Sequence, residues 1–505
     1  MGEIRWDLGD LEPAVRSRLR HLAEQKVVER IWEKDHTVWG EDPTEIVDRL
    51  GWLHAVERSR GELDRIRRFV KEVRESGLAQ SVLLGMGGSS LAAEVIRRTF
   101  FSAELPPFDL AVLDTTHGDA LARLEAEIPL DRALFLASSK SGTTIETRSH
   151  LAYFHDRHRS GSRFAAITDP GSPLEHEGTR LGFRGVFSSP ADVGGRYSAL
   201  TVFGLLPAAL MGVDPELLLL EAAGAMRRCL PEAAVDENPA AVLGAVLSEA
   251  ALAGRDKLTL VLPDDLAPFG AWMEQLVAES TGKDGTGIIP IDAEPRTRTY
   301  GDDRLFLAIG EPTDLMPSVT VPFRRLADLG ALFFLFEFAV AVAGSILRIN
   351  PFDQPNVQEA KDRTDDMLSR KSNGSEPYGN LDALLESALP GGYVAIQAFV
   401  NPTPDAWKML QAARGRILNR LGVATTLGFG PRYLHSTGQL HKGGPPGGVF
   451  VQVFEEPNED REIPGRPYTF GQLISAQAAG DLAALRARGR PVARVAMEDL
   501  VAWEG

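Results

Sequence analysis

The sequence predicts an α/β fold in which mainly parallel sheets carry helices on both faces. Two features lead to this prediction. Short apolar runs of strand length alternate with helical stretches, and an Ala/Leu-rich stretch at about 199–254 divides the alternation into two series. A chain of 505 residues is also too long for one ordinary hydrophobic core. We therefore expect two αβα-sandwich domains, preceded by an N-terminal helical arm.

The elements follow in order along the chain. Residues 1–50 are charged and helix-like, and their spaced tryptophans indicate an arm that packs onto another part of the protein. The first series predicts strands at 81–84, 110–113, 133–137 and 164–167. The second predicts strands at 258–262, 287–291, 305–308, 318–321, 393–400, 424–428 and 449–454. We expect a first domain at 51–215, a helical connection at 216–255, and a second domain with a C-terminal extension at 256–505.

Composition argues against three properties: nucleic-acid binding, a zinc site and secretion. The chain has 54 basic and 70 acidic residues, a formal net charge of −16, and no long basic stripe, so we expect no nucleic-acid partner. Its single cysteine, Cys229, has no second thiol to pair with, and no Cys/His cluster indicates zinc. The first residues do not resemble a secretory signal, so we expect a cytoplasmic protein.

One segment, 329–346, is apolar enough to raise the question of a membrane. A spanning helix needs about 20 such residues. This segment has no second partner segment and carries Glu337 near its middle, and ionisable groups are costly inside a bilayer. We therefore expect a buried core helix and no membrane contact.

A glycine-rich turn at 85–90, Gly-Met-Gly-Gly-Ser-Ser, follows the first predicted strand and precedes a helix. Glycines allow a tight turn whose N–H groups face an anion, and a helix N-terminus adds a favourable partial charge. The turn matches neither the dinucleotide fingerprint, because Ser90 replaces its last glycine, nor a Walker loop. By itself the motif fits an anion site and a plain strand–helix turn equally well.

A second strand–helix turn is richer in chemistry. From Ser139 to Thr144 the sequence places four hydroxyl side chains and Lys140 within six residues. Hydroxyl and N–H groups at a helix start form a good phosphate cradle. The alternative is a helix cap made by Thr143 or Thr144, with Glu146 in the first turn, but a cap uses one hydroxyl and leaves the others idle. The motif therefore favours phosphate binding.

Two further motifs could supply proton chemistry. Gly194-Gly195-Arg196 could present a guanidinium that stabilises an oxyanion, or could be a surface turn with a solvated arginine. Gln275 and Glu279 are four residues apart and share one helix face. Glu279 could act as a general base if it faces a cleft; otherwise it is a solvated glutamate.

Two segments later in the chain combine rigid turns with histidines and lysines. The run 349–357 contains two prolines and leads into a helix that carries Lys361. The run 433–444 contains His435, His441 and a lysine in a glycine-rich loop, which indicates proton chemistry or an anion site. No carboxylate accompanies these histidines at ligand spacing, so we expect no metal.

Together, and in this order, these motifs resemble the phosphoglucose isomerase family, which is built from two sugar-isomerase (SIS) domains of flavodoxin-like fold. The specific pieces are SSKSGTTIET at 138–147, GGRYS at 194–198, QLVAES with GK at 275–283, and NPFDQP-V-x3-K at 350–361. The resemblance covers nearly the whole chain from about residue 44. More narrowly, three further segments are similar to the isomerase half of bifunctional transaldolase/glucose-6-phosphate isomerases: 31–39, 300–306 and 431–445.

The resemblance implies an aldose–ketose isomerase of glycolysis and gluconeogenesis. It would interconvert glucose 6-phosphate and fructose 6-phosphate through an enediolate, with neither metal nor cofactor, and would form a homodimer. The implied base is Glu279, Arg196 would stabilise the enediolate, and Lys361 would assist ring opening. The residues implied to bind the substrate and its phosphate are Gly88, Ser89, Ser139, Lys140, Ser141, Thr144, Thr147, Gly195, Gln275 and Gln354.

One departure from the family concerns the residue that opens the sugar ring. The family's ring-opening histidine lies between the glutamate and the lysine, but residues 280–360 contain no histidine here. A similar piece, His-Ser-Thr-Gly-Gln, begins at His435, after the lysine. We hypothesise that His435 takes this role by a different chain route, with His441 in reserve. The alternatives are Tyr300 and Asp302.

Three other functions stay open at this point. A non-catalytic SIS-type sugar-phosphate sensor would need the phosphate loop but neither Glu279 nor Lys361. An isomerase that also accepts mannose 6-phosphate fits the same motifs. The third is a vestigial isomerase that serves a separate transaldolase as a partner module.

Overall fold

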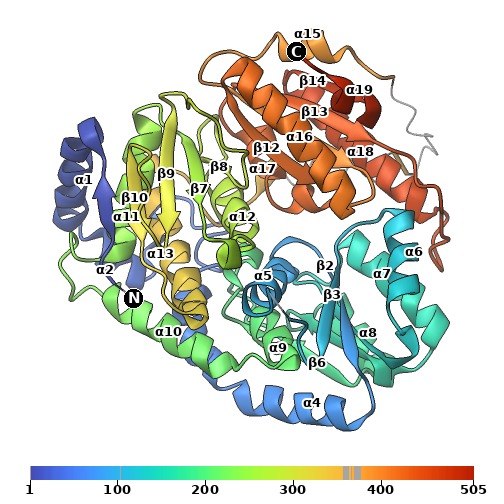
Figure 1. The fold of residues 1–505 in the computed structure, drawn as a ribbon. Coiled ribbons are helices and arrows are strands. Elements are labelled where there is room, and N and C mark those ends of the chain that lie inside the picture. The colour runs from blue at the N-terminus through green and yellow to red at the C-terminus, as the bar shows by residue number, and fades with distance from the viewer. Residues whose placement is uncertain (1, 103, 357–362, 365–366, 369–376) are drawn as a thin grey trace.

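Mainly parallel sheets with helices packed beside them make up the molecule, which confirms the predicted α/β class. The computed structural model describes residues 2–102, 104–356, 363–364, 367–368 and 377–505, and within these ranges the strands form three sheets (Figure 1). The sequence pattern predicted two.

The first sheet is parallel throughout and has the strand order β3-β2-β4-β5-β6. Its strands are β2 (Gln80–Gly85), β3 (Asp109–Leu113), β4 (Ala133–Ser138), β5 (Phe164–Thr168) and β6 (Gly185–Ser188). The accompanying helices are α4 (Leu63–Glu75), α5 (Leu91–Phe100), α6 (Gly118–Glu127), α7 (Ile145–His158), α8 (Pro173–Arg180) and α9 (Val202–Met211). Gly85 of β2 pairs with Ser138 of β4, so the loops that follow these two strands start side by side.

The second sheet has the order β1-β10-β9-β7-β8 and contains one antiparallel edge strand. Its strands are β1 (Arg5–Asp7), β7 (Lys257–Val261), β8 (Ile289–Ile291), β9 (Arg304–Ile309) and β10 (Ser318–Val321). The predicted N-terminal arm is mainly helical, with α1 (Glu12–Glu24) and α2 (Val27–Trp32), and it begins with the short strand β1, which pairs with β10; α3 (Ala55–Arg60) follows the arm. Three residues are too few for an alternating pattern to show in the sequence.

The third sheet is parallel and has the order β12-β11-β13-β14. Its strands are β11 (Tyr393–Phe399), β12 (Ala424–Phe429), β13 (Gly448–Phe454) and β14 (Val492–Val495). The helices are α15 (Leu381–Leu385), α16 (Pro404–Leu421), α17 (Gly438–Gly443), α18 (Phe470–Ala487) and α19 (Met497–Ala502). The second predicted series is thus divided between two sheets, because strand patterns report burial but do not specify which strands pair.

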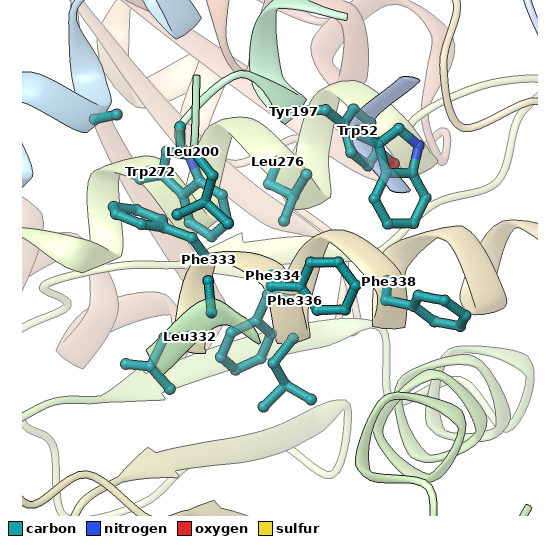
Figure 2. Packing of buried hydrophobic residues seen from close by; sticks show 14 of the residues in the cluster. Trp52, Tyr197, Leu200, Trp272, Leu276, Leu332, Phe333, Phe334, Phe336 and Phe338 are labelled. Atoms are coloured by element: carbon teal, nitrogen blue, oxygen red, sulfur yellow. The ribbon is translucent and has the colours of Figure 1, made fainter. Parts of the chain in front are cut away.

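Helix α13 (Leu329–Leu347) forms the centre of the largest core. It packs against α10 (Pro215–Arg228), α11 (Pro239–Leu252) and α12 (Phe269–Thr281). Figure 2 shows Phe333 of this helix beside Trp272 of α12, and their ring centroids are 4.8 Å apart. The helix is long and apolar enough to cross a membrane, but 94% of its most apolar window is buried inside the protein, as predicted for a core helix.

This core also fixes the segments that carry the candidate site. Trp272 and Leu276 of α12, the helix that also carries Gln275 and Glu279, pack in this core beside α13 (Figure 2). Tyr197, directly after Arg196, packs against Trp52 in the same core, with ring centroids 5.3 Å apart. Rigid packing of both neighbours holds the polar residues beside them in place.

Candidate active site

The glycine turn after β2 is in close contact with three other candidate motifs. A Cβ on Gly87, whose φ is +53°, would lie 2.6 Å from the His435 carbonyl oxygen and 2.9 Å from the Gln275 amide nitrogen. A Cβ on Gly88 would lie 2.2 Å from the Gly195 carbonyl oxygen. Only glycine permits such approaches. The turn therefore joins residues that lie far apart in the sequence, and it is more than a strand–helix connection.

Arg196 lies at the centre of this junction, and its guanidinium is almost completely buried. Its Nε donates to the Ser280 hydroxyl at 2.8 Å, and its Nη1 donates to the Gln354 Oε1 at 2.9 Å. Its Nη2 donates to the backbone carbonyl oxygens of Pro351 and Asp353 at 2.7 and 2.9 Å. The alternative of a solvated surface arginine is wrong.

Glu279 is held through both carboxylate oxygens. Its Oε1 lies 3.3 Å from Nη1 of Arg196, and its Oε2 accepts a hydrogen bond of 3.1 Å from Gln275 Nε2. The same amide nitrogen donates to the His435 carbonyl oxygen at 2.8 Å. Glu279 is only 8% exposed, so the alternative of a solvated glutamate is also wrong. A carboxylate that is fixed and shielded from water has the geometry that a general base requires.

His435 faces a carboxylate that no sequence motif assigned to the site. Its Nε2 lies 2.9 Å from Oε1 of Glu146, which belongs to the first turn of α7 and is 289 residues away in the sequence. Glu146 also accepts a hydrogen bond of 2.6 Å from Gln477 Nε2 of α18. A carboxylate on one ring nitrogen orients the imidazole.

Proteins of similar sequence include several glucose-6-phosphate isomerases. A family model described as phosphoglucose isomerase matches residues 47–294. The glucose-6-phosphate isomerase of Thermosynechococcus vestitus is 30% identical over 371 residues, which cover 60% of this chain and 70% of that protein. The chain belongs to the phosphoglucose isomerase family. The glucose-6-phosphate isomerase of Carboxydothermus hydrogenoformans is 29% identical over 404 residues, which cover 64% of this chain and 85% of the relative.

Solved structures share the fold of this family member. The hypothetical protein TT0462 from Thermus thermophilus has a TM-score of 0.62 at 22% identity and covers 72% of this chain and 100% of its own. A glucose-6-phosphate isomerase from Chlamydia trachomatis has a TM-score of 0.59 at 17% identity, with 72% of this chain and 87% of its own covered.

The hydroxyl loop at 139–144 lies beside the glycine turn. Ser138 Oγ donates to the Ser89 carbonyl oxygen at 2.7 Å, which ties the two loops together. Thr144 occupies the N-cap position of α7, but its hydroxyl lies 2.9 Å from the Ser139 hydroxyl and makes no capping bond. The cap explanation is therefore wrong for Thr144. Ser141, by contrast, is exposed and bonds to Thr143 at 2.9 Å.

Two predicted phosphate ligands are already occupied by other contacts. The Lys140 ammonium donates to Asp169 Oδ2 at 2.5 Å and to the Ala191 carbonyl oxygen at 3.3 Å. Burial lowers the pKa of Lys140, and the Asp169 ion pair opposes that shift. Thr147 is completely buried, and its hydroxyl donates to the Ser138 carbonyl oxygen at 3.4 Å. Both residues thus support the loop from inside the protein. Ser141 lies at the surface of the loop, and Ser139 is buried directly beneath it.

The alternative ring-opening residues lie away from this junction. Tyr300 packs edge-to-face against Phe306, with ring centroids 5.2 Å apart, near the amino-terminal end of β9, and Asp302 is exposed there. His441 is buried with its Nδ1 at 3.0 Å from the Gln397 amide nitrogen, and burial holds its pKa well below the ordinary value. Of the four candidates, His435 is the one that contacts the turn beside Glu279. Lys361 lies outside the described residues.

A second buried cation accompanies Arg196. The Lys283 ammonium is 3% exposed and donates to Asp353 Oδ1 at 2.6 Å and to the Asn350 carbonyl oxygen. Burial and the nearby Arg196 charge lower its pKa to about 8. Nothing in the sequence indicated that Lys283 is part of the site, beyond its place at a helix end. Its partners, Asp353 and Asn350, lie about seventy residues away in the chain. In the part of the chain that the structure describes, no group of three or more His, Cys, Asp or Glu side chains could hold a metal ion.

Proposed function

We propose that this chain is a glucose-6-phosphate isomerase that interconverts D-glucose 6-phosphate and D-fructose 6-phosphate, with Glu279 as the base. The observation that carries the proposal is the Glu279 carboxylate, which is fixed between Arg196 and Gln275. Both relatives described above are named glucose-6-phosphate isomerases. The cation and the amide place the carboxylate for proton transfer at one or two adjacent carbons.

The substrate phosphate would bind at the 139–144 loop. Ser139, Ser141 and Thr144 offer hydroxyls at the start of α7, a helix of 14 residues whose N-terminus favours an anion. Lys140 would act from beneath, through its ion pair with Asp169 and its charge. The phosphate would then serve as a remote handle whose binding energy positions the reacting carbons.

Ring opening requires two proton transfers. The bond from C1 to the ring oxygen breaks as the ring oxygen gains a proton and the C1 hydroxyl loses one. We assign these transfers to His435, oriented by Glu146, and to Lys361. The Glu146 carboxylate, 2.9 Å from Nε2 of His435, would hold the imidazole in place for its transfer.

Isomerisation then takes place on the open chain. Glu279 removes the proton at C2, an enediolate forms, and the same carboxylate returns the proton at C1 while a proton passes between O1 and O2. Arg196 stabilises the negative charge of the enediolate, and the loss of one such donor typically costs about 100- to 1,000-fold in rate. Gln275 and Gln354 orient the site from either side of Glu279 and Arg196.

The decisive experiment replaces the base and measures turnover and binding separately. Glu279→Gln keeps the shape of the side chain, so we expect kcat for glucose 6-phosphate to fall at least about 1,000-fold while fructose 6-phosphate still binds. A sugar-phosphate sensor would show no turnover in the wild type either. Glu249→Gln is a matched control, because Glu249 is also part-buried and pairs with an arginine, Arg18, at 2.6 Å.

The role of His435 is tested with a substrate that has no ring. D-Erythrose 4-phosphate stays open because its O4 is esterified, so deuterium exchange at its C2 reports Glu279 without ring opening. We expect His435→Ala to lose about 100-fold or more on glucose 6-phosphate and to keep most of the exchange. Equal loss in both reactions would show that His435 has another role.

Finer assignments belong to the same proposal. We propose two SIS-type domains at 51–215 and 256–505, joined by the helical connection at 216–255, a cytoplasmic location and a homodimer. The strands after residue 256 belong to two sheets, so the second proposed domain contains two separate sheets. A direct assay with both sugars decides whether mannose 6-phosphate is also a substrate.

A further inference from the structure

We infer that Asp481 of α18 is a positioning residue for His435: its single carboxylate anchors both ends of the loop that carries the histidine. This inference rests on the proposed isomerase function of the same site. In the described part of the chain the Asp481 carboxylate bonds to Tyr433 and Lys442 rather than to Glu279 or Arg196, so it would act only through His435 and the backbone around it.

The loop has little internal structure that could hold His435. The residue lies at the end of a single turn of 3-10 helix, Arg432–His435, and α17 begins three residues later. Short turns of this kind depend on outside contacts for their orientation. The position of the imidazole therefore depends on what anchors the loop.

Asp481 anchors the loop on both sides of His435. Its Oδ2 accepts a hydrogen bond of 2.7 Å from the Tyr433 hydroxyl, two residues before the histidine. Its Oδ1 accepts one of 2.5 Å from the Lys442 ammonium, seven residues after it. Lys442 also donates to the Gly438 carbonyl oxygen at 3.2 Å. All three side chains are at most 3% exposed, so water does not compete for these bonds.

The same helix also holds the partner of the histidine. Gln477 lies one turn before Asp481 in α18 and donates to Glu146 Oε1 at 2.6 Å. The other end of its amide accepts a hydrogen bond of 2.8 Å from the Thr116 hydroxyl. Residues four apart project from one face of a helix. One face of α18 therefore sets the positions of both His435 and Glu146.

Stability alone does not account for this arrangement. A buried ion pair contributes little net stability, because two charges must leave water, and an apolar pair of similar size is often as stable. What the pair does provide is a defined geometry, since one carboxylate must satisfy a phenol and an ammonium together. A displacement of about 1 Å in a catalytic group can cost about 100-fold in rate.

The test removes the charges in a way that keeps the fold. Asp481→Asn alone would leave the buried Lys442 ammonium unpaired, so the variant of choice is Lys442→Met/Asp481→Asn, in which an amide oxygen still accepts from Tyr433. We expect kcat/KM for glucose 6-phosphate to fall about 10- to 100-fold. Deuterium exchange at C2 of D-erythrose 4-phosphate should stay within about 3-fold of the wild type.

A matched control is the pair of Lys257, which is buried, and Asp256, which is part-buried, 2.7 Å apart at the amino-terminal end of β7. Lys257→Met/Asp256→Asn should change stability without changing the ratio of the two reactions. In a His435→Ala background, Lys442→Met/Asp481→Asn should cost nothing further, because its effect passes through His435.

Three results would overturn the inference: equal loss of both reactions, no loss of either, or an additive loss in the His435→Ala background. A wild-type protein that does not isomerise glucose 6-phosphate would refute the proposed function instead, and the two failures are therefore distinguishable.

Discussion

Replacing Gly88 by alanine tests whether contact between two backbone turns positions Arg196. The added Cβ would lie 2.2 Å from the Gly195 carbonyl oxygen, 2.4 Å from its carbon and 2.9 Å from the Arg196 nitrogen. Backbone atoms have no rotamer with which to move away. Because carbon normally keeps more than about 3 Å from such neighbours, one of the two turns must shift by about 1 Å.

The size of the effect follows from this displacement. Overpacking of a rigid interior costs about 1–3 kcal/mol of stability, which a chain of this size should survive. The larger effect should be catalytic, because Arg196 is held by four hydrogen bonds that a shift of the turn would lengthen. A misplacement of about 1 Å can cost about 100-fold in rate, equivalent to about 2.7 kcal/mol of barrier.

The assay compares kcat/KM for glucose 6-phosphate with the thermal unfolding midpoint of the same preparation. Gly194→Ala is the matched control, because Gly194 has φ −65° and ψ 155°, and its Cβ would lie no closer than 3.7 Å to Tyr197. We expect the control to keep its activity within about 3-fold. Activity of Gly88→Ala within the same margin would refute the argument that this contact positions the arginine.

The other predictions concern the pocket, the pH and the assembly. A Cβ on Gly195 meets no atom of the described residues within 4 Å, so Gly195→Ala should fold normally and raise KM for the sugar phosphate, as steady-state kinetics would show; an unchanged KM would mean that substrate does not lie there. Burial lowers the pKa of Lys283 from 10.5 to about 8, so between these values the unfolded chain binds a proton that the folded chain does not. The unfolding free energy of the wild type should then rise relative to Lys283→Met by about 1.4 kcal/mol per pH unit above pH 8, and a flat difference in urea titrations would contradict this. Since Glu279, Arg196 and His435 converge within one chain, specific activity should stay constant on dilution from micromolar to nanomolar protein, even if a homodimer dissociates.

The sequence alone correctly predicted those structural features that depend on residues close together in the chain. Strand and helix periodicity predicted the α/β class, and the apolar run at 329–346 predicted the buried core helix. The spacing of Gln275 and Glu279 correctly placed both on one face of α12, because four residues make about one helical turn. These predictions held because each depends on neighbours within a few residues.

Tertiary structure decided which distant residues meet. The pairing of His435 with Glu146, of Lys283 with Asp353, and the division of the later strands between two sheets have no signature in either partner alone. Periodicity reports which face of an element is buried, but not against what it is buried. Contacts over such separations arise from how whole elements pack, which is why only the folded chain shows that His435, and neither His441 nor Tyr300, lies beside the turn at Glu279.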